Sequence, residues 1–260
     1  MTLAYRLEGA EAGPVVVLSS SIGTTAALWD AQVPLLGSRF RVLRYDHPGH
    51  GASSDPDGPV TIEALATGVV DLLDRLELET VAFCGLSLGG MVGMALARAA
   101  PERVERLVLC CTAAYLGPPE RWRERAETVR AEGTTAIADA VLERWFTERF
   151  RQEQPGTVAR FRGTFEGVSR EGYALCCEAI ATWDLRSGLD GIRAPTLVIA
   201  GAEDIATPPD DAAFLATSIT GAELVVLPEA AHLANVEQPE LFGDALFEFL
   251  SATPSSEEAA

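Results

Sequence analysis

The chain has 260 residues, 48% of them hydrophobic, and a formal net charge of −18; arginine supplies every basic side chain except three histidines. Because lysine is absent, the sequence excludes Schiff-base, pyridoxal-phosphate and Ser–Lys chemistry, and its acidity argues against nucleic acid or an anionic membrane as a partner. Five cysteines without a CxxC motif, no leader segment and no apolar run of about 20 residues predict a cytoplasmic protein with reduced thiols and no metal.

Short runs rich in β-branched residues predict buried parallel strands, because they lack the alternation of strands with one wet face. In chain order they cover residues 14–18, 40–46, 80–86, 103–111, 194–201 and 222–229. Helical patterns lie between them, at residues 61–76, 88–100, 209–219 and 238–250. This alternation predicts an open, mostly parallel α/β sheet flanked by helices.

The alternation stops between residues 113 and 188, where the pattern is helical and eleven arginines nearly balance twelve carboxylates. We expect this segment to be a helical lid, inserted after the sixth strand and lying over the carboxyl ends of the strands. The core would then comprise residues 1–112 and 189–252. The polar tail, residues 253–260, is expected to be disordered.

Residues 85–89 read Gly-Leu-Ser-Leu-Gly between a predicted strand and a predicted helix, which matches the G-x-S-x-G nucleophile elbow. Such a turn strains the backbone of the nucleophile, and side chains at its two glycines would collide with neighbouring elements. The following helix would leave the N–H of Leu88 free to bind an oxyanion. A purely structural glycine-rich turn is the alternative, but the flanking elements favour Ser87 as a nucleophile.

A nucleophilic serine needs a base, and in this kind of site the histidine is the last of the three residues along the chain. His232 is the one histidine that follows Ser87. His47 and His50 lie in a turn-rich loop before Ser87 and are expected to be structural. His232 is therefore the predicted base.

The acid should follow a strand between the serine and the histidine. Asp204 lies three residues beyond Gly201, the end of the strand at 194–201, and is the predicted partner that orients His232. Glu203 is adjacent to it. Asp210 and Asp211 lie at a predicted helix start, where carboxylates have a structural role of their own.

A second oxyanion donor is expected in the loop after the strand at 14–18, which reads SSSIGTTAALWDAQ. Its position predicts the Ile22 N–H as this donor, with Leu88 as the first. Ser21, one residue earlier, is the alternative and is expected to border the substrate. A simple Ser/Gly-rich loop is the other interpretation.

Several stretches match one family: SSIGTTAALWDAQ, FRVLRYDHPGHGASS, FCGLSLGGMVG, ADAVLERWFT, EGYALCCEAIATWDLR, APTLVIAGAEDIATPP and AAHLANVEQPELF. Through them the chain resembles the 3-oxoadipate enol-lactonases, which are α/β-hydrolases. The resemblance implies hydrolysis of 3-oxoadipate enol-lactone to 3-oxoadipate in aromatic-compound breakdown, with Ser87, Asp204 and His232 as the triad. It also places Trp145 in the substrate-facing part of the lid, although Trp145 and Phe146 suit the lid's own core equally well.

The chain departs from the family pattern at two positions. Pro48 stands where the family often has arginine, so any help from that arginine in holding a substrate carboxylate is missing. Gly68 lies inside a predicted helix, where an exposed glycine costs about 1 kcal/mol relative to alanine.

The expected partner is a small anionic lactone, and the near-neutral, arginine-rich lid is the expected place for carboxylate recognition. The chemistry requires no cofactor. Self-association into a homo-oligomer is left open. The alternatives are a carboxylesterase, a C–C hydrolase or a perhydrolase with the same triad, or a receptor on the same fold. Dehalogenases and epoxide hydrolases of this fold use aspartate where this chain has Ser87.

Overall fold

The central sheet has seven strands in the order β1-β3-β2-β4-β5-β6-β7, and every neighbouring pair except β1 and β3 is parallel. This computed structural model describes residues 2–252. Its strands are β1 (Tyr5–Gly9), β2 (Val15–Ser19), β3 (Arg41–Tyr45), β4 (Val81–Leu86), β5 (Val104–Cys110), β6 (Thr196–Gly201) and β7 (Glu223–Leu227). The predicted parallel α/β sheet is confirmed, and each of the six expected strands is present.

The strand β1 was not predicted. Its sequence, YRLEG, is charged and mostly exposed, because it forms the antiparallel edge of the sheet beside β3. An edge strand with polar side chains lacks the continuous apolar run that identifies a strand buried on both faces.

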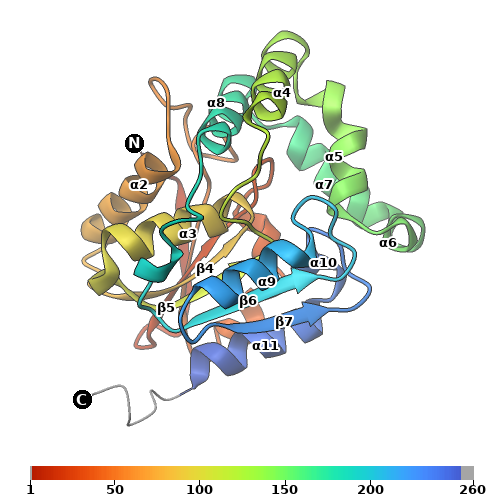
Figure 1. Cartoon of the computed structure of the whole chain (residues 1–260). Helices are drawn as coiled ribbons and strands as arrows, with labels where there is room; N and C mark the ends of the chain where they lie inside the picture. The colour runs from red at the N-terminus through yellow and green to blue at the C-terminus, as the bar shows by residue number, and fades with distance from the viewer. Residues whose placement is uncertain (1, 253–260) are drawn as a thin grey trace.

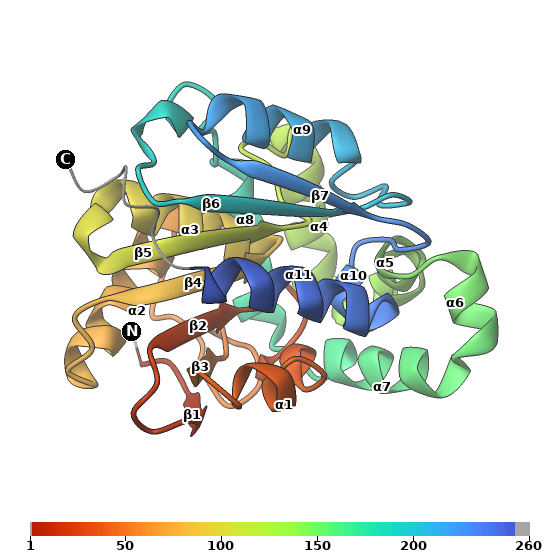
Figure 2. The same ribbon diagram turned by 90° about the horizontal axis from the view of Figure 1, so that it is seen from below.

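Helices cover both faces of the sheet: α2 and α3 lie on one face and α11 lies on the other (Figures 1 and 2). The helices outside the 113–188 segment are α1 (Val33–Leu36), α2 (Ile62–Arg75), α3 (Leu88–Ala99), α9 (Pro209–Ser218), α10 (Ala234–Glu237) and α11 (Pro239–Ser251). Short 3-10 turns cover Ala26–Trp29, Pro101–Arg103, Thr134–Ile137 and Leu189–Gly191. The helices predicted from sequence correspond to α2, α3, α9 and α11.

Helix α2 shows how the sequence sets its bounds. Thr61 precedes the helix in an extended conformation, and its hydroxyl accepts a hydrogen bond from the Ala64 N–H (3.1 Å). Leu65, Val69 and Leu72 form the buried stripe. Gly68 lies in this helix and is buried rather than exposed, so the penalty expected for an exposed glycine does not apply as stated.

Residues 113–188, called the cap below, form five helices between β5 and β6, at the end of the sheet where the strands finish (Figure 1). These are α4 (Pro119–Glu132), α5 (Ala138–Trp145), α6 (Glu148–Glu153), α7 (Pro155–Glu166) and α8 (Arg170–Ala181). Helices α4 and α8 pack against each other, and Arg130 joins them through ion pairs with Glu171 (2.9 Å) and Glu178.

The cap follows the fifth strand of the chain, so its expected place after a sixth strand is wrong. The reason lies at the N-terminal edge. Residues before β2 supply one short antiparallel strand, β1, and only four parallel strands precede the cap.

Within residues 2–252 no helix is both long and apolar enough to cross a membrane. All five cysteines are buried free thiols. The tail expected to be disordered, residues 253–260, lies outside the described residues.

Candidate active site

Ser87 lies in the turn between the end of β4 and the start of α3. Its backbone angles are φ 57° and ψ −112°, a strained region for a residue with a side chain. The flanking glycines are required by space: a Cβ at Gly85 would overlap the carbonyl of Gly89, and one at Gly89 would overlap the carbonyl of Ser19. The turn therefore holds the serine at the carboxyl end of the central strand.

His232 lies in the loop between β7 and α10, and its ring is oriented by Asp204. The His232 Nδ1–H donates to Asp204 Oδ2 (2.8 Å). Burial alone would raise the pKa of Asp204. The attraction of His232, with hydrogen bonds from His232 and Thr207, outweighs burial and holds that pKa below its usual value. The carboxylate therefore stays ionised beside the ring.

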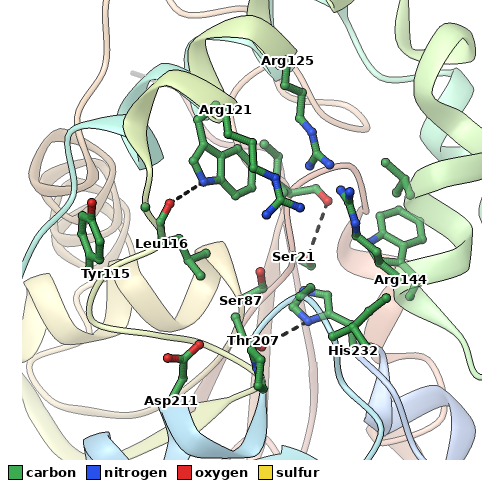
Figure 3. Close-up of a pocket in the computed structure, with 18 of the residues that line it drawn as sticks. Ser21, Ser87, Tyr115, Leu116, Arg121, Arg125, Arg144, Thr207, Asp211 and His232 are labelled. Atoms are coloured by element: carbon green, nitrogen blue, oxygen red, sulfur yellow. Dashed lines mark hydrogen bonds between the residues drawn. The ribbon is translucent and has the colours of Figure 1, made fainter.

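Thr207 is a member of this arrangement that sequence reasoning missed. Its hydroxyl donates to Asp204 Oδ2 (2.7 Å) and its N–H donates to Oδ1 (3.1 Å), while the Ala206 N–H also donates to Oδ1 (2.7 Å). The Thr207 hydroxyl lies 3.4 Å from His232 Nδ1 (Figure 3). A hydroxyl residue three positions after the predicted acid is the signal that could have found it.

Ile22 lines the same cavity as Ser87, and Leu88 directly follows Ser87 as the first residue of α3. Neither backbone N–H has a hydrogen-bond acceptor among residues 2–252. The neighbouring Gly89 N–H donates to the Ser20 carbonyl (3.1 Å), which fixes the loop after β2 against the start of α3. Two unoccupied donors beside Ser87 are the arrangement that an oxyanion hole requires.

His47 and His50 bind the backbone of the loop after β2 through their rings. His47 Nε2 donates to the Ser20 carbonyl (2.9 Å), and His50 Nε2 accepts from the Gly23 N–H (2.9 Å). Burial, then the nearby His50, lowers the pKa of His47 to about 3, and burial also lowers the pKa of His50. Both rings are therefore neutral at neutral pH and act as structural clamps.

Ser87, His232, Ile22, Ser21 and Trp145 all line one cavity of about 350 Å³. The Trp145 indole packs edge-on against Phe165, with ring centroids 5.5 Å apart, and is 4% exposed. The neighbouring ring of Phe146 instead stacks on Phe150 inside the cap. Of the two aromatic residues weighed from the sequence, Trp145 faces the cavity.

Three arginines of the cap converge on the space above Ser87: Arg121 and Arg125 from α4 and Arg144 from α5 (Figure 3). Among residues 2–252, none of the three has a carboxylate within ion-pair distance. Burial, then repulsion from Arg125 and Arg121, lowers the pKa of Arg144. Asp211 borders the cavity on the opposite side, from α9. The cap thus presents a concentrated positive charge to whatever fills the cavity.

Pro48, the departure noted in the sequence, does not line this cavity. Its carbonyl accepts from His50 Nδ1–H (2.9 Å) and so fixes the tautomer of that clamp. The positive charge of the cavity is carried by the cap arginines, whose individual roles the sequence left unassigned.

Known proteins share this fold over nearly the whole chain. Residues 14–239 match the family model described as the alpha/beta hydrolase fold. The 3-oxoadipate enol-lactonase 2 of Acinetobacter baylyi is 42% identical over 246 residues, which cover 95% of this chain and 92% of that protein.

Two solved structures are also similar. The enol-lactonase from Burkholderia xenovorans LB400 superposes with a TM-score of 0.94 at 45% identity, covering 96% of each chain. A thermophilic esterase from Thermogutta terrifontis with malate bound has a TM-score of 0.91 at 33% identity, covering 95% of this chain and 92% of its own. This chain therefore belongs to the α/β-hydrolase fold family and, within it, to the family of the 3-oxoadipate enol-lactonases.

Proposed function

We propose that this protein is a serine hydrolase that opens the lactone ring of 3-oxoadipate enol-lactone to give 3-oxoadipate. The observation that carries the proposal is the cavity itself, where Ser87 and His232 face three cap arginines that lack carboxylate partners among residues 2–252. An ester that carries a free carboxylate satisfies both halves of this cavity. The names of the 42% and 45% identical relatives support the identity of the ester.

Ring opening begins at Ser87. His232 accepts the hydroxyl proton as Oγ attacks the lactone carbonyl, and Asp204 stabilises the imidazolium that forms. The Leu88 and Ile22 N–H groups bind the oxyanion, and each donor is worth about 3 kcal/mol in sites of this kind. The result is an acyl-enzyme on Ser87.

The leaving group of this lactone is an enolate that stays attached to the acyl chain. Its oxygen leaves more easily than a simple alkoxide. The enolate takes up at carbon the proton that His232 accepted from Ser87 and becomes the ketone of 3-oxoadipate, which returns His232 to its neutral form. Water activated by His232 then attacks the acyl-enzyme, and the second carboxylate is released from Ser87. The three arginines hold the substrate's own carboxylate throughout, which keeps the open chain in the cavity.

A general carboxylesterase is the second candidate, and the similarity to the Thermogutta terrifontis esterase favours it. The two candidates share the triad and differ in what the arginines do. An esterase without carboxylate recognition would turn over neutral esters as well as the lactone.

The test is ring opening of 3-oxoadipate enol-lactone by the purified protein, beside p-nitrophenyl acetate. We expect fast lactone turnover, weak ester cleavage, and a loss of at least about 10³-fold in kcat for both in Ser87→Ala. Brisk ester cleavage without lactone turnover would leave the triad in place and favour the esterase. Labelling of Ser87 by a fluorophosphonate without turnover of either would contradict the proposed activity and favour a receptor.

We also propose a cytoplasmic location and a small anionic lactone as the substrate, with no nucleic-acid or membrane partner. Five buried free thiols support a reducing compartment, and the net charge of −18 disfavours polyanions. Sedimentation velocity would test whether the chain forms a homo-oligomer, a question that the sequence leaves open.

A further inference from the structure

The residues before and after His232, Ala231 and Leu233, both donate their backbone N–H to groups outside the His232 turn. The Leu233 N–H donates to the Trp145 carbonyl (2.9 Å), and the Ala231 N–H donates to Glu237 Oε2 (2.6 Å). Trp145 is the last residue of α5 in the cap, and α10, which ends at Glu237, lies beside that end of the cap (Figures 1 and 2). The backbone of the predicted base is therefore tied to the cap as well as to the core.

The carboxylate of Glu237 completes this connection. Its Oε1 accepts hydrogen bonds from the Thr147 N–H (2.9 Å) and from the Thr147 hydroxyl (2.8 Å). The same hydroxyl caps α6 by accepting from the Phe150 N–H (3.1 Å). Glu237 is only 9% exposed, so these three donors, with the Ala231 N–H among them, replace the water that a carboxylate would otherwise bind.

We infer that Glu237 is a positioning residue for the hydrolysis. Its carboxylate fastens the His232 loop to the start of α6, so that His232 and the cavity wall at Trp145 keep one fixed relative position. Asp204 orients the His232 ring, and Glu237 of α10 ties the backbone at Ala231, next to His232, to Thr147 of the cap. This inference rests on the proposed role of His232 as the catalytic base.

Trp145 lines the cavity, and its carbonyl accepts a hydrogen bond from the N–H of Leu233, the residue after His232. A substrate that contacts Trp145 is therefore linked to the His232 loop through this hydrogen bond. Misplacement of a catalytic group by about 1 Å can cost on the order of 10²-fold in rate. A loosened connection should therefore lower kcat, while the side chains that contact the substrate stay in place and KM changes little.

The test uses the full chain and two variants that break the connection at different ends. Glu237→Gln keeps the size of the side chain but puts an NH₂ donor where one oxygen accepts. Thr147→Val removes only the hydroxyl, and Thr147→Ser restores it. Glu240→Gln, which removes an exposed carboxylate on α11, is the matched control.

We expect kcat for the enol-lactone to fall about tenfold or more in Glu237→Gln and about threefold or more in Thr147→Val, with KM within about twofold of the parent. Thr147→Ser and Glu240→Gln should match the parent. The low-field proton resonance of the His232 Nδ1–H should shift in Glu237→Gln and stay unchanged in Glu240→Gln.

A folded Glu237→Gln protein with unchanged kcat and an unshifted resonance would overturn the inference, even if its melting temperature fell. If Glu237→Gln does not fold, the comparison of kcat between Thr147→Val and Thr147→Ser takes its place. Equal kcat values for these two variants would overturn the inference. His232→Ala separates the two claims. If it stays active, the proposed base is wrong; if it is inactive while Glu237→Gln is unaffected, only the positioning role fails.

Discussion

The backbone strain at Ser87 is held by neighbours on both sides of the residue. Its N–H donates to the Cys110 carbonyl (2.9 Å), and the Thr112 hydroxyl donates to the Ser87 carbonyl (2.7 Å). A non-glycine residue in such a conformation costs on the order of 1–3 kcal/mol. Because Cys110 at the end of β5 and Thr112 two residues later bind both peptide groups, the nucleophile keeps this conformation and its hydroxyl stays directed into the cavity.

The buried histidines behind the oxyanion loop predict a stability that depends on acidity. The pKa of His47 is about 3 in the fold, and that of His50 is also lowered, against about 6.5 for each in the unfolded chain. Below pH 6.5 the unfolded chain therefore binds more protons than the fold. The stability that His47 contributes should be fully present above pH 6.5 and fall by about 1.4 kcal/mol per pH unit as the pH drops towards 3, and His50 adds a loss in the same direction.

Urea denaturation at pH 7, 6 and 5 measures this effect. In His47→Gln the side-chain amide can still donate to the Ser20 carbonyl, but it cannot titrate. We expect the dependence on pH to be shallower in this variant by about 1.4 kcal/mol per unit. Parallel curves for the two proteins would show that His47 is not held neutral in the fold.

At the scale of elements, the turn between β4 and α3 works only with glycine at both flanks. Gly89→Ala puts a methyl group into the Ser19 carbonyl, and the backbone there cannot yield without moving β2. We expect a loss of more than about 4 kcal/mol in the free energy of unfolding. Gly163→Ala is the matched control, because that glycine is exposed in α7 and a Cβ there meets nothing within 4 Å. It should stabilise the protein by about 1 kcal/mol, as helix propensity predicts.

Thermal and urea unfolding of both variants decide the point. A Gly89→Ala protein as stable as its parent would mean that the strand-to-helix turn is looser than described. If Gly89→Ala also kept the kcat of its parent, the claim that the turn beside Ser87 requires glycine at position 89 would be wrong.

The elements that were predictable are those with a strong local pattern. The six buried strands are continuous apolar runs, and the glycines around Ser87 identify the turn because sterics there leave no other residue type. The edge strand β1 was not predictable in the same way, because its side chains are exposed and its pairing partner β3 lies more than thirty residues away. The expected place of the cap after a sixth strand was too high, because four predicted strands precede residue 113 and β1 adds only a fifth.

At the scale of the whole molecule, the site is assembled from the core and the cap together. Ser87, Asp204 and His232 come from turns after three strands of the sheet. The G-x-S-x-G motif, the strand ends and the chain order together predicted them. Glu237 and Thr147 meet across a separation of 90 residues. Nothing in either local sequence signals such a contact, because it depends on how the cap packs against α10.

Charge is distributed unevenly between the cap and the rest of the molecule. The cap is nearly neutral while the remainder of the chain is strongly acidic, and the three arginines above Ser87 have no carboxylate of their own among residues 2–252. This charge distribution supports the proposal that the cap holds an anionic substrate and presents it to the nucleophile in the core. This arrangement makes carboxylate recognition the central claim about the protein.

The most direct test is the ratio of kcat/KM for 3-oxoadipate enol-lactone to kcat/KM for its neutral methyl ester. A charged hydrogen bond in such a cavity is worth about 2–3 kcal/mol, so the lactone with its free carboxylate should be preferred by about 30- to 150-fold. The ratio should fall at least tenfold in Arg144→Gln and stay unchanged in Arg123→Gln, an exposed arginine on α4 that pairs with Glu120. Equal turnover of the acid and the ester by the parent protein would contradict the account.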